Sequence, residues 1–254
     1  MRPTTTGFDP RLPDLRNLRD VGGLRTSDGR RVRPGRVLRS ASPFFLDAVQ
    51  ARLLVDALGV RTRVDLRTED EIEECPNEHV SALPHDAHHL PLRAGGAWER
   101  RVESVDPSEA VATHYLRYLE HSPGSIASVV RLAADAARTP MLVHCSAGKD
   151  RTGVVLAVML SAVGVDHDEI VTDYGRTRDD LEPMLDQLRS LDAYRARLEV
   201  LPEESLTAEP RTMEIFLAGL EQRYGGARSY LGTHGVDEPV LDGLAGVLLE
   251  PDTA

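Results

Sequence analysis

The chain has 254 residues, of which 41% are hydrophobic and 28% charged, and its formal net charge is −11. This hydrophobic content is sufficient for a buried core, and no long Pro-, Gly- or Ser-rich linker divides the chain, so we expect a single domain over residues 1–254. The acidic balance argues against a nucleic-acid partner, and the lack of an apolar run of about 18 residues excludes a transmembrane helix.

The first part of the chain alternates short apolar runs with helical patterns. Residues 1–14 carry three prolines and no periodicity, which predicts an extended arm. Residues 32–40, 60–66, 88–92 and 141–143 predict strands, and residues 46–58, 107–120, 126–137 and 154–163 predict helices, with a further short helix beginning near Thr68. This alternation favours an α/β fold in which helices flank a central sheet.

The remainder of the chain is predicted to be helical. One helix begins near Asp168, and helices over 213–223 and 236–249 close the domain. Residues 173–210 are rich in charge and place Leu181, Leu185 and Leu188 at helical spacing. Two interpretations of this segment stay open: a helical hairpin that covers the sheet, or a mobile lid over a catalytic cleft.

Residues 144–153 carry the chemistry: His-Cys-Ser-Ala-Gly-Lys-Asp-Arg-Thr-Gly, between the strand at 141–143 and the helix at 154–163. Such a loop leads into a helix N-terminus, whose unpaired N–H groups and positive dipole favour a bound phosphate. Gly148 and Gly153 let the backbone approach the ligand. Lys149 is the only lysine among 30 basic residues.

Two side chains of this loop have clear chemical roles. The helix N-terminus favours the thiolate form of Cys145, which is the nucleophilic form. Arg151, six positions later, has a planar guanidinium that can bind two phosphate oxygens in the transition state. We also expect Thr152 to donate a hydrogen bond to the sulfur and to assist its departure. Neither nucleophilic attack by Cys145 nor charge stabilisation by Arg151 requires a metal or a cofactor, and we expect none.

The loop resembles the Cys-x5-Arg signature of the protein tyrosine phosphatase superfamily. The form HCxxGKDRTG is similar to the atypical bacterial tyrosine phosphatases, which include secreted mycobacterial and listerial enzymes with dual or triple specificity. Residues 17–23 (NLRDVGG), 37–40 (VLRS) and 59–67 (GVRTRVDLR) match the pattern of the same group, as do Tyr224-Gly225-Gly226 near the C-terminus. The resemblance covers roughly residues 15–249.

The resemblance implies roles for further residues. It places Ser146, Ala147, Gly148, Lys149, Asp150 and Arg151 around the substrate phosphate. We also expect Arg39 to contact substrate, and His144, Asn17 and Asp20 to support the loop. For the general acid, the resemblance points to Asp65, at the end of the strand at 60–66, and Asp150 is the alternative. The expected substrates are phosphotyrosine proteins, with phosphoserine, phosphothreonine and phosphoinositides as additions suggested by Lys149.

Several alternatives stay open. A rhodanese-like sulfurtransferase also uses a loop cysteine on an α/β sheet, and a phosphate- or phosphoinositide-binding module without catalysis would retain the same loop. Two cysteines give no disulfide framework, and His85, His88 and His89 lack a clear carboxylate or Cys partner, so we expect no metal site. The N-terminus lacks the apolar core of a secretory signal, which predicts a cytoplasmic protein or one exported without a recognisable signal peptide. The oligomeric state is not predicted.

Overall fold

The computed structural model describes residues 12–95, 106–201 and 203–251. Within them a single sheet has the strand order β1-β2-β5-β3-β4. The strands are β1 (Arg19–Asp20), β2 (Val37–Ser40), β3 (Thr62–Asp65), β4 (Asp86–His89) and β5 (Met141–His144). Strand β1 pairs antiparallel with β2, and the other pairs are parallel. The carboxyl ends of β2, β5 and β3 therefore meet at one edge of the sheet, where Ser40, His144 and Asp65 lie in register.

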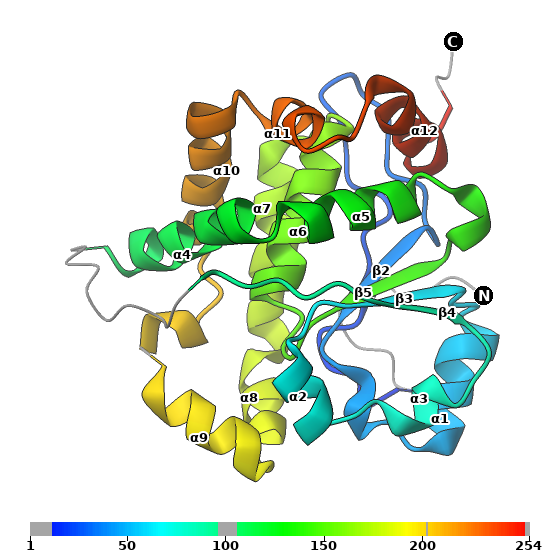
Figure 1. Ribbon diagram of the computed structural model, residues 1–254, viewed down its shortest axis with the longest axis vertical. Coiled ribbons are helices and arrows are strands. Elements are labelled where there is room, and N and C mark those ends of the chain that lie inside the picture. Colours follow the sequence, from blue (N-terminus) through cyan, green and yellow to red (C-terminus); the bar gives the residue numbers. More distant parts are fainter. Residues whose placement is uncertain (1–11, 96–105, 202, 252–254) are drawn as a thin grey trace.

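Helices cover both faces of this sheet (Figure 1). Their bounds are α1 (Ala48–Arg52), α2 (Glu69–Glu74), α3 (Glu78–Ser81), α4 (Pro107–His121), α5 (Pro123–Ala133), α6 (Asp150–Ala162), α7 (His167–Gly175), α8 (Leu181–Arg189), α9 (Asp192–Val200), α10 (Pro210–Tyr224), α11 (Ala227–Thr233) and α12 (Glu238–Leu248). Short 3-10 turns lie at Pro43–Phe45, Ala136–Arg138, Arg176–Asp180 and Glu203–Leu206, and a π-helical turn spans Leu53–Ala57.

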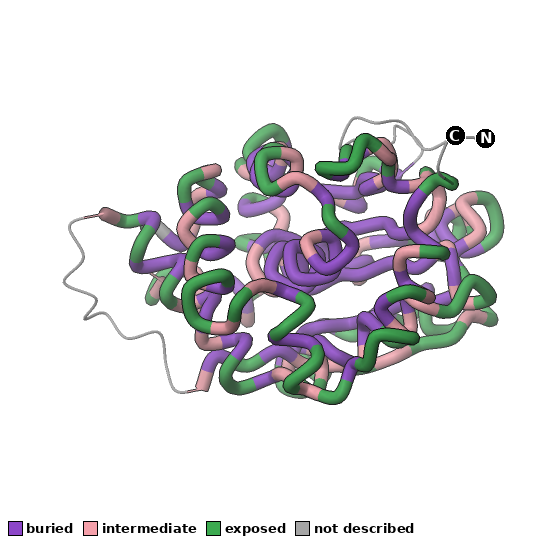
Figure 2. The backbone as a smooth tube through the Cα atoms, turned by 90° about the horizontal axis from the view of Figure 1, so that it is seen from above, coloured by how far each residue is buried: buried purple, intermediate pink, exposed green. Residues whose placement is uncertain are grey.

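The two faces of the sheet have separate hydrophobic cores. Val64 and Val143 belong to the larger one, which includes buried residues of α4, α5, α6 and α10. Leu38 and Leu142 point to the other face, where they pack with Leu54 and with Leu12 from the N-terminal segment. Figure 2 shows the buried residues concentrated through the centre of the molecule and the exposed ones on the outer turns. Helix α6 is almost entirely buried, and the sheet and this helix together hold the loop between them.

The predicted α/β fold with a helix-flanked sheet is confirmed, and the differences are local. Only the last four residues of the strand expected at 32–40 form β2, because Val32 makes an isolated bridge with Leu249 instead. The helix expected at 46–58 is divided into α1 and the π-helical turn. Helix α6 begins at Asp150, four residues earlier than predicted. The arm predicted at 1–14 lies outside the described residues as far as residue 11, and Leu12 is fully buried.

Candidate active site

The loop is held in shape by the strand before it and the helix after it. Cys145 follows the last residue of β5, and α6 begins at Asp150. Between them Gly148 has a φ of +66°, a left-handed conformation that favours glycine. A Cβ at this position would lie 2.2 Å from the carbonyl oxygen of Ser40 in β2. Only glycine fits here, which explains why the loop can curl tightly against the carboxyl end of the sheet.

A cavity of about 140 Å³ lies over this loop. Its polar lining comes from the loop and from α2: Glu71, Cys145, Ser146, Ala147, Lys149, Asp150 and Arg151. Its other side is mainly apolar and comes from α8, α9 and the turn that follows: Leu181, Met184, Leu185, Leu188, Tyr194, Arg197, Leu198, Leu201, Ser205 and Leu206. The segment predicted at 173–210 thus covers the loop, and Cys145 is only 2% exposed beneath it.

Arg151 is oriented by a carboxylate that the sequence analysis did not identify. Its Nη1 and Nη2 donate to the two carboxylate oxygens of Glu71, at 2.6 and 2.8 Å. The Ser146 hydroxyl of the loop donates to the same carboxylate at 2.5 Å. Burial opposes the charge of Glu71, but Arg151 and Ser146 more than offset that effect, so the pKa of Glu71 is held below its ordinary value. Glu71 therefore ties the guanidinium to the loop as an ionised partner.

Lys149 and Asp150 form a second pair at the loop. Lys149 Nζ lies 2.7 Å from Asp150 Oδ1 and donates to the carbonyl oxygen of Ser205 at 2.9 Å. The hydroxyl of Tyr115, which also bonds to the hydroxyl of Tyr174, donates to Asp150 at 2.5 Å. Burial raises the pKa of Asp150, and Lys149 and Tyr115 lower it by more, so the pKa lies below its ordinary value. Asp150 lines the cavity that contains Cys145.

The carboxylate of Asp65 does not line the cavity that contains Cys145. Its carboxylate accepts hydrogen bonds from the Arg67 guanidinium, the closest at 2.8 Å, and from Asn77 Nδ2 at 3.0 Å. The Nε2 of His144 is 3.7 Å away. Burial opposes ionisation, but the hydrogen bonds and the charge of Arg67 keep the pKa of Asp65 below its ordinary value. Asp65 lines a different hollow, of about 480 Å³, together with His89. The structure brings Asp150, and not Asp65, into the cavity of Cys145.

His144 is enclosed next to this carboxylate. It is 0% exposed, and burial lowers its pKa to about 3, so the imidazole is neutral over the physiological range. Its Nδ1 lies 3.4 Å from the carbonyl oxygen of Cys145. Thr152, also fully buried, has a hydroxyl without a hydrogen-bond partner among the described residues. Such a group is costly when left unpaired, and it lies in the first turn of α6, directly after the loop.

Arg39 lies behind the loop and not in the cavity. Its Nη2 donates to the carbonyl oxygen of Gly148 at 2.7 Å, and its Nη1 pairs with Asp173 of α7 at 2.6 Å. Arg19 pairs with the same carboxylate at 2.7 Å. Burial and the neighbouring Arg19 lower the pKa of Arg39 to about 10, which still leaves it charged. Two buried cations with one carboxylate leave positive charge under the loop, which favours an anion above it.

The two other residues expected to support the loop are separated in the structure. Asn17 donates from Nδ2 to the carbonyl oxygens of Ala147 and Gly148, at 3.1 and 3.0 Å. Asp20 instead accepts from the backbone N–H groups of Gly22 and Gly35, at 2.8 and 2.5 Å, and so holds a turn away from the loop.

Three residues around the loop were not among the site residues predicted from the sequence: Glu71, Asp173 and Tyr194. A signal for Glu71 is present in the sequence, because Thr68 and Glu71 have the spacing of a capping box, in which the glutamate reaches back to the helix start. The Glu71 carboxylate does accept from the Thr68 N–H at 2.9 Å, and its further bonds to Arg151 and Ser146 depend on tertiary structure. Asp173 and Tyr194 are far from the loop in sequence, and no local pattern links them to it.

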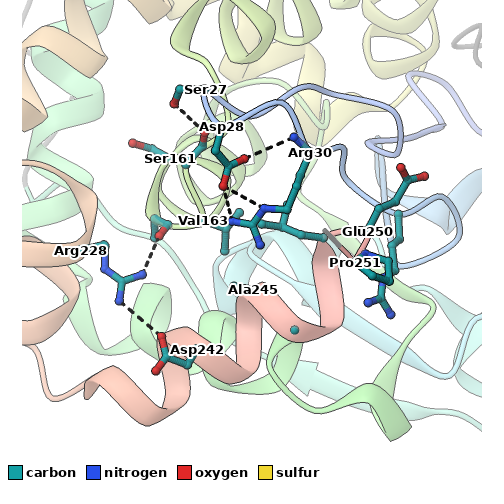
Figure 3. Close-up of a pocket in the computed structure, with 15 residues that line it drawn as sticks. Ser27, Asp28, Arg30, Ser161, Val163, Arg228, Asp242, Ala245, Glu250 and Pro251 are labelled. Atoms are coloured by element: carbon teal, nitrogen blue, oxygen red, sulfur yellow. Dashed lines mark hydrogen bonds and ion pairs between the residues drawn. The ribbon is translucent and has the colours of Figure 1, made fainter. Parts of the chain in front are cut away.

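A larger hollow, of about 580 Å³, lies at the other end of α6 and is lined by Ser161, Ala162 and Val163 (Figure 3). At about 1.5 Å per residue, this end is roughly 20 Å from the loop. Two of its arginines face carboxylates: Arg30 lies 2.6 Å from Asp28, and Arg228 lies 3.8 Å from Asp242. These pairs balance the charge, and the hollow lacks the nucleophile and helix N-terminus found at the loop.

A buried cysteine in a curled loop, an arginine six positions later and the N-terminus of a buried helix together define a cysteine-dependent phosphatase. The chain belongs to the tyrosine phosphatase family, whose model matches residues 10–250. This membership confirms the resemblance seen in residues 144–153 and favours the phosphatase over the sulfurtransferase alternative.

Two relatives with similar sequences agree with this assignment. The chain is 28% identical over 275 residues to the triple specificity protein phosphatase PtpB of Mycobacterium tuberculosis, which covers 94% of this chain and 98% of that protein. It is 29% identical over 193 residues to a tyrosine-protein phosphatase of Nostoc commune, over 74% of this chain and 66% of that protein. Among solved structures, TpbA of P. aeruginosa matches with a TM-score of 0.38 at 22% identity, over 76% of this chain and 95% of that chain.

Neither a membrane-spanning helix nor a metal-binding cluster is present among the described residues. No helix there has the length and apolar character needed to cross a membrane. No group of three or more His, Cys, Asp or Glu side chains in the described ranges is arranged to hold a metal ion.

Proposed function

We propose that this chain is a phosphatase of broad specificity that hydrolyses phosphotyrosine, phosphoserine, phosphothreonine and phosphoinositide monoesters through a phosphocysteine intermediate. One observation carries the proposal. A single cavity is lined by the thiol of Cys145, the guanidinium of Arg151 and the carboxylate of Asp150, beneath an apolar cover. These are a nucleophile, a group that binds the equatorial oxygens and a group that can transfer a proton, which are what the reaction requires.

The reaction has two steps. In the first, the thiolate of Cys145 attacks phosphorus, the bond to the leaving oxygen breaks, and that oxygen receives a proton from the acid. In the second, water attacks the phosphocysteine, the P–S bond breaks, and the same carboxylate takes the proton from water. Arg151 and the N–H groups at the start of α6 hold the charge of the equatorial oxygens throughout. We assign Thr152 to donate to the departing sulfur, which would give its otherwise unpaired hydroxyl a hydrogen-bond partner.

Asp150 is the acid that the geometry favours. It lines the cavity, whereas the Asp65 carboxylate is bound by Arg67 and Asn77 and lines another hollow. In the ligand-free protein Lys149 keeps the pKa of Asp150 low. A phosphate dianion in the loop raises that pKa, because it adds negative charge nearby and competes with Asp150 for Lys149. Substrate binding thus favours the protonated form of Asp150 at the step that uses its proton.

Lys149 and the apolar cover support the wider range of substrates. The lysine is buried, charged and held at the loop, so it can bind a second anionic group of the substrate, such as another phosphate of an inositol ring. The leucines of α8 face the same cavity and suit an aromatic ring or a lipid chain. The relative from M. tuberculosis carries the name of a triple specificity phosphatase, which agrees with this range.

The segment from α8 to residue 206 acts in this proposal as a lid. Its polar links to the rest of the site are few: Tyr194 donates to the Ser146 hydroxyl at 3.0 Å, the Ser205 carbonyl accepts from Lys149 at 2.9 Å, and Arg197 pairs with Glu74 of α2 at 2.7 Å. Figure 1 shows α8 and α9 at the margin of the molecule beside α2. Substrate must displace this cover to reach Cys145, and the cover shields the thiolate between turnovers.

The test is phosphate release in EDTA from a phosphotyrosine peptide, a phosphoserine peptide and a panel of phosphoinositides, by the parent and by Cys145→Ser. We expect release from all three classes by the parent, and a loss of at least about 10⁴-fold in Cys145→Ser, since removal of a nucleophile abolishes the covalent route. Release that persists in Cys145→Ser contradicts the phosphocysteine mechanism. Turnover confined to phosphotyrosine overturns the broad specificity and leaves the mechanism intact.

A further inference from the structure

Asn17 occupies an unusual position between two parts of the site. It is 1% exposed and has a φ of +57°, a left-handed conformation that few residues other than glycine adopt and that asparagine tolerates best. The Arg19 guanidinium donates to its side-chain oxygen. The side chain is thereby fixed with its amide nitrogen toward the loop, where it donates to the carbonyl oxygens of Ala147 and Gly148.

The backbone of the same residue contacts the start of the lid. The N–H of Asn17 donates to Asp180 Oδ2 at 2.5 Å, and the Arg16 guanidinium lies 3.4 Å from Asp180 Oδ1. Asp180 is the residue immediately before α8, and it makes no side-chain hydrogen bond to cap that helix. An aspartate at this position commonly caps its own helix. The Asp180 carboxylate instead accepts a hydrogen bond from the Asn17 N–H and so links the start of α8 to residue 17.

One buried residue therefore bonds to the loop with its side chain and to the lid with its backbone. The left-handed conformation allows both contacts, because it turns the N–H toward Asp180 while the side chain reaches Gly148. Gly148 cannot shift toward the sheet, since Ser40 already lies against it. A movement of the first turn of α8 that displaces Asp180 must then strain either this bond or the two bonds to the loop.

We infer that Asn17 is a positioning residue that couples the start of α8 to the phosphate loop, so that the lid and the loop bind phosphate as one unit. The inference rests on the proposed function of the loop and extends it. Because coupling is reciprocal, a bound phosphate that orders Gly148 also strengthens the hold on Asp180, and loss of Asp180 weakens phosphate binding although Asp180 does not line the cavity of Cys145.

Three variants separate the two contacts. Asn17→Gly removes the bonds to the loop but keeps the left-handed backbone and the N–H that reaches Asp180. Asp180→Ala removes the contact with the lid and leaves the Asn17 side chain in place. Asp180→Asn restores an acceptor oxygen for the Asn17 N–H and serves as the conservative rescue. Asp179→Ala, at an exposed position in the same turn, is the matched control. A thermal melt of each variant establishes that it is folded.

The measurement is alkylation of Cys145 by iodoacetamide as a function of pH, with and without inorganic phosphate, which gives an apparent Kd for phosphate and a pH midpoint for the thiol. We expect Asn17→Gly and Asp180→Ala each to weaken phosphate binding by about fivefold or more and to shift the pH midpoint. The double variant should lose no more than the weaker-binding single variant, because both changes break one connection. Asp180→Asn should recover most of the loss, and Asp179→Ala should match the parent.

Two results overturn the inference: a folded Asp180→Ala with the phosphate Kd and pH midpoint of Asp179→Ala, or a double variant whose loss is the product of the two single losses. Failure of the proposed function gives a different result, in which phosphate does not protect Cys145 of the parent. The pH midpoint then still reports whether Asp180 acts on the loop, since that midpoint is measured without phosphate.

Discussion

The floor of the active site and its roof are built in different ways. The floor is the loop at 144–151 with β5 and α6. It is buried and is held from behind by Arg39 and Asn17, which bond to the Gly148 carbonyl. The roof is residues 181–206. It meets the floor mainly through leucines, with the bonds of Tyr194 and of the Ser205 carbonyl as polar links. In the proposed mechanism, the chemistry depends on the fixed geometry of the floor, while access depends on release of the roof.

After the loss of Cys145 itself, the largest effect should come from Asp150, the proposed acid in the floor. Asp150→Asn should lower kcat by about 10²–10⁴-fold and remove the limb of the pH–rate profile that reports the proton donor. The loss should be smaller for an aryl phosphate whose phenol is acidic, because such a leaving group needs little protonation. Steady-state kinetics with an alkyl and an acidic aryl phosphate, each over a range of pH, measure both effects.

Asp65→Asn is the matched comparison for this prediction. The change leaves Arg67 without its buried counter-charge, and breaking a buried pair costs about 3–5 kcal/mol of stability. We expect a lower Tm with the pH–rate profile of the parent. If Asp65→Asn loses the limb and becomes sensitive to the acidity of the leaving group while Asp150→Asn shows neither change, the proton donor is Asp65.

The next effect concerns the carboxylate that orients Arg151. Glu71→Gln keeps the size of the side chain but removes the charge that binds both guanidinium nitrogens. We expect kcat/KM to fall by about 10- to 100-fold, because a small displacement of the arginine misplaces the phosphate. Glu73→Gln, on the exposed side of the same helix, should have the kinetics of the parent.

The same variant has a signature in acid. The pKa of Glu71 in the folded protein lies below its ordinary value of 4.5, so its ion pair contributes stability that is complete above about pH 4.5 and is lost as the pH falls through the folded pKa. The parent should therefore lose stability on acidification more steeply than Glu71→Gln. The free energy of unfolding of the parent and of Glu71→Gln, measured with denaturant, gives this dependence on pH. If it falls equally steeply in both proteins below pH 4.5, and kcat/KM is unchanged, then Glu71 does not hold Arg151 in solution.

The sequence predicts the floor well and the roof less well, for a physical reason. Cys145, Gly148 and Arg151 act through a loop that is continuous in the chain, so their spacing carries the geometry. The sheet and most helices follow from apolar periodicity in the same way. The groups that position the loop come from distant elements: Glu71 of α2 bonds to Arg151, and Asp173 of α7 bonds to Arg39 behind the loop. Such contacts are set by packing. Helical spacing also predicts that Leu181, Leu185 and Leu188 share one face of a helix, but it does not determine which surface that face covers.

The smallest effect should come from the roof. Tyr194→Phe keeps the ring, which stacks on Phe44 with centroids 5.7 Å apart, and removes only the hydroxyl that bonds to Ser146. One neutral hydrogen bond contributes about 0.5–1.5 kcal/mol, so the closed roof should lose a few-fold in population. We expect iodoacetamide to alkylate Cys145 a few-fold faster and a protease to nick residues 181–206 sooner, with kcat little changed.

Tyr224→Phe, at the end of α10, controls for the loss of a hydroxyl that does not face the cavity. Phosphate should slow the nicking in the parent. Equal alkylation and nicking in parent and Tyr194→Phe would show that the leucines alone hold the roof, and equal nicking of the parent with and without phosphate would count against a lid.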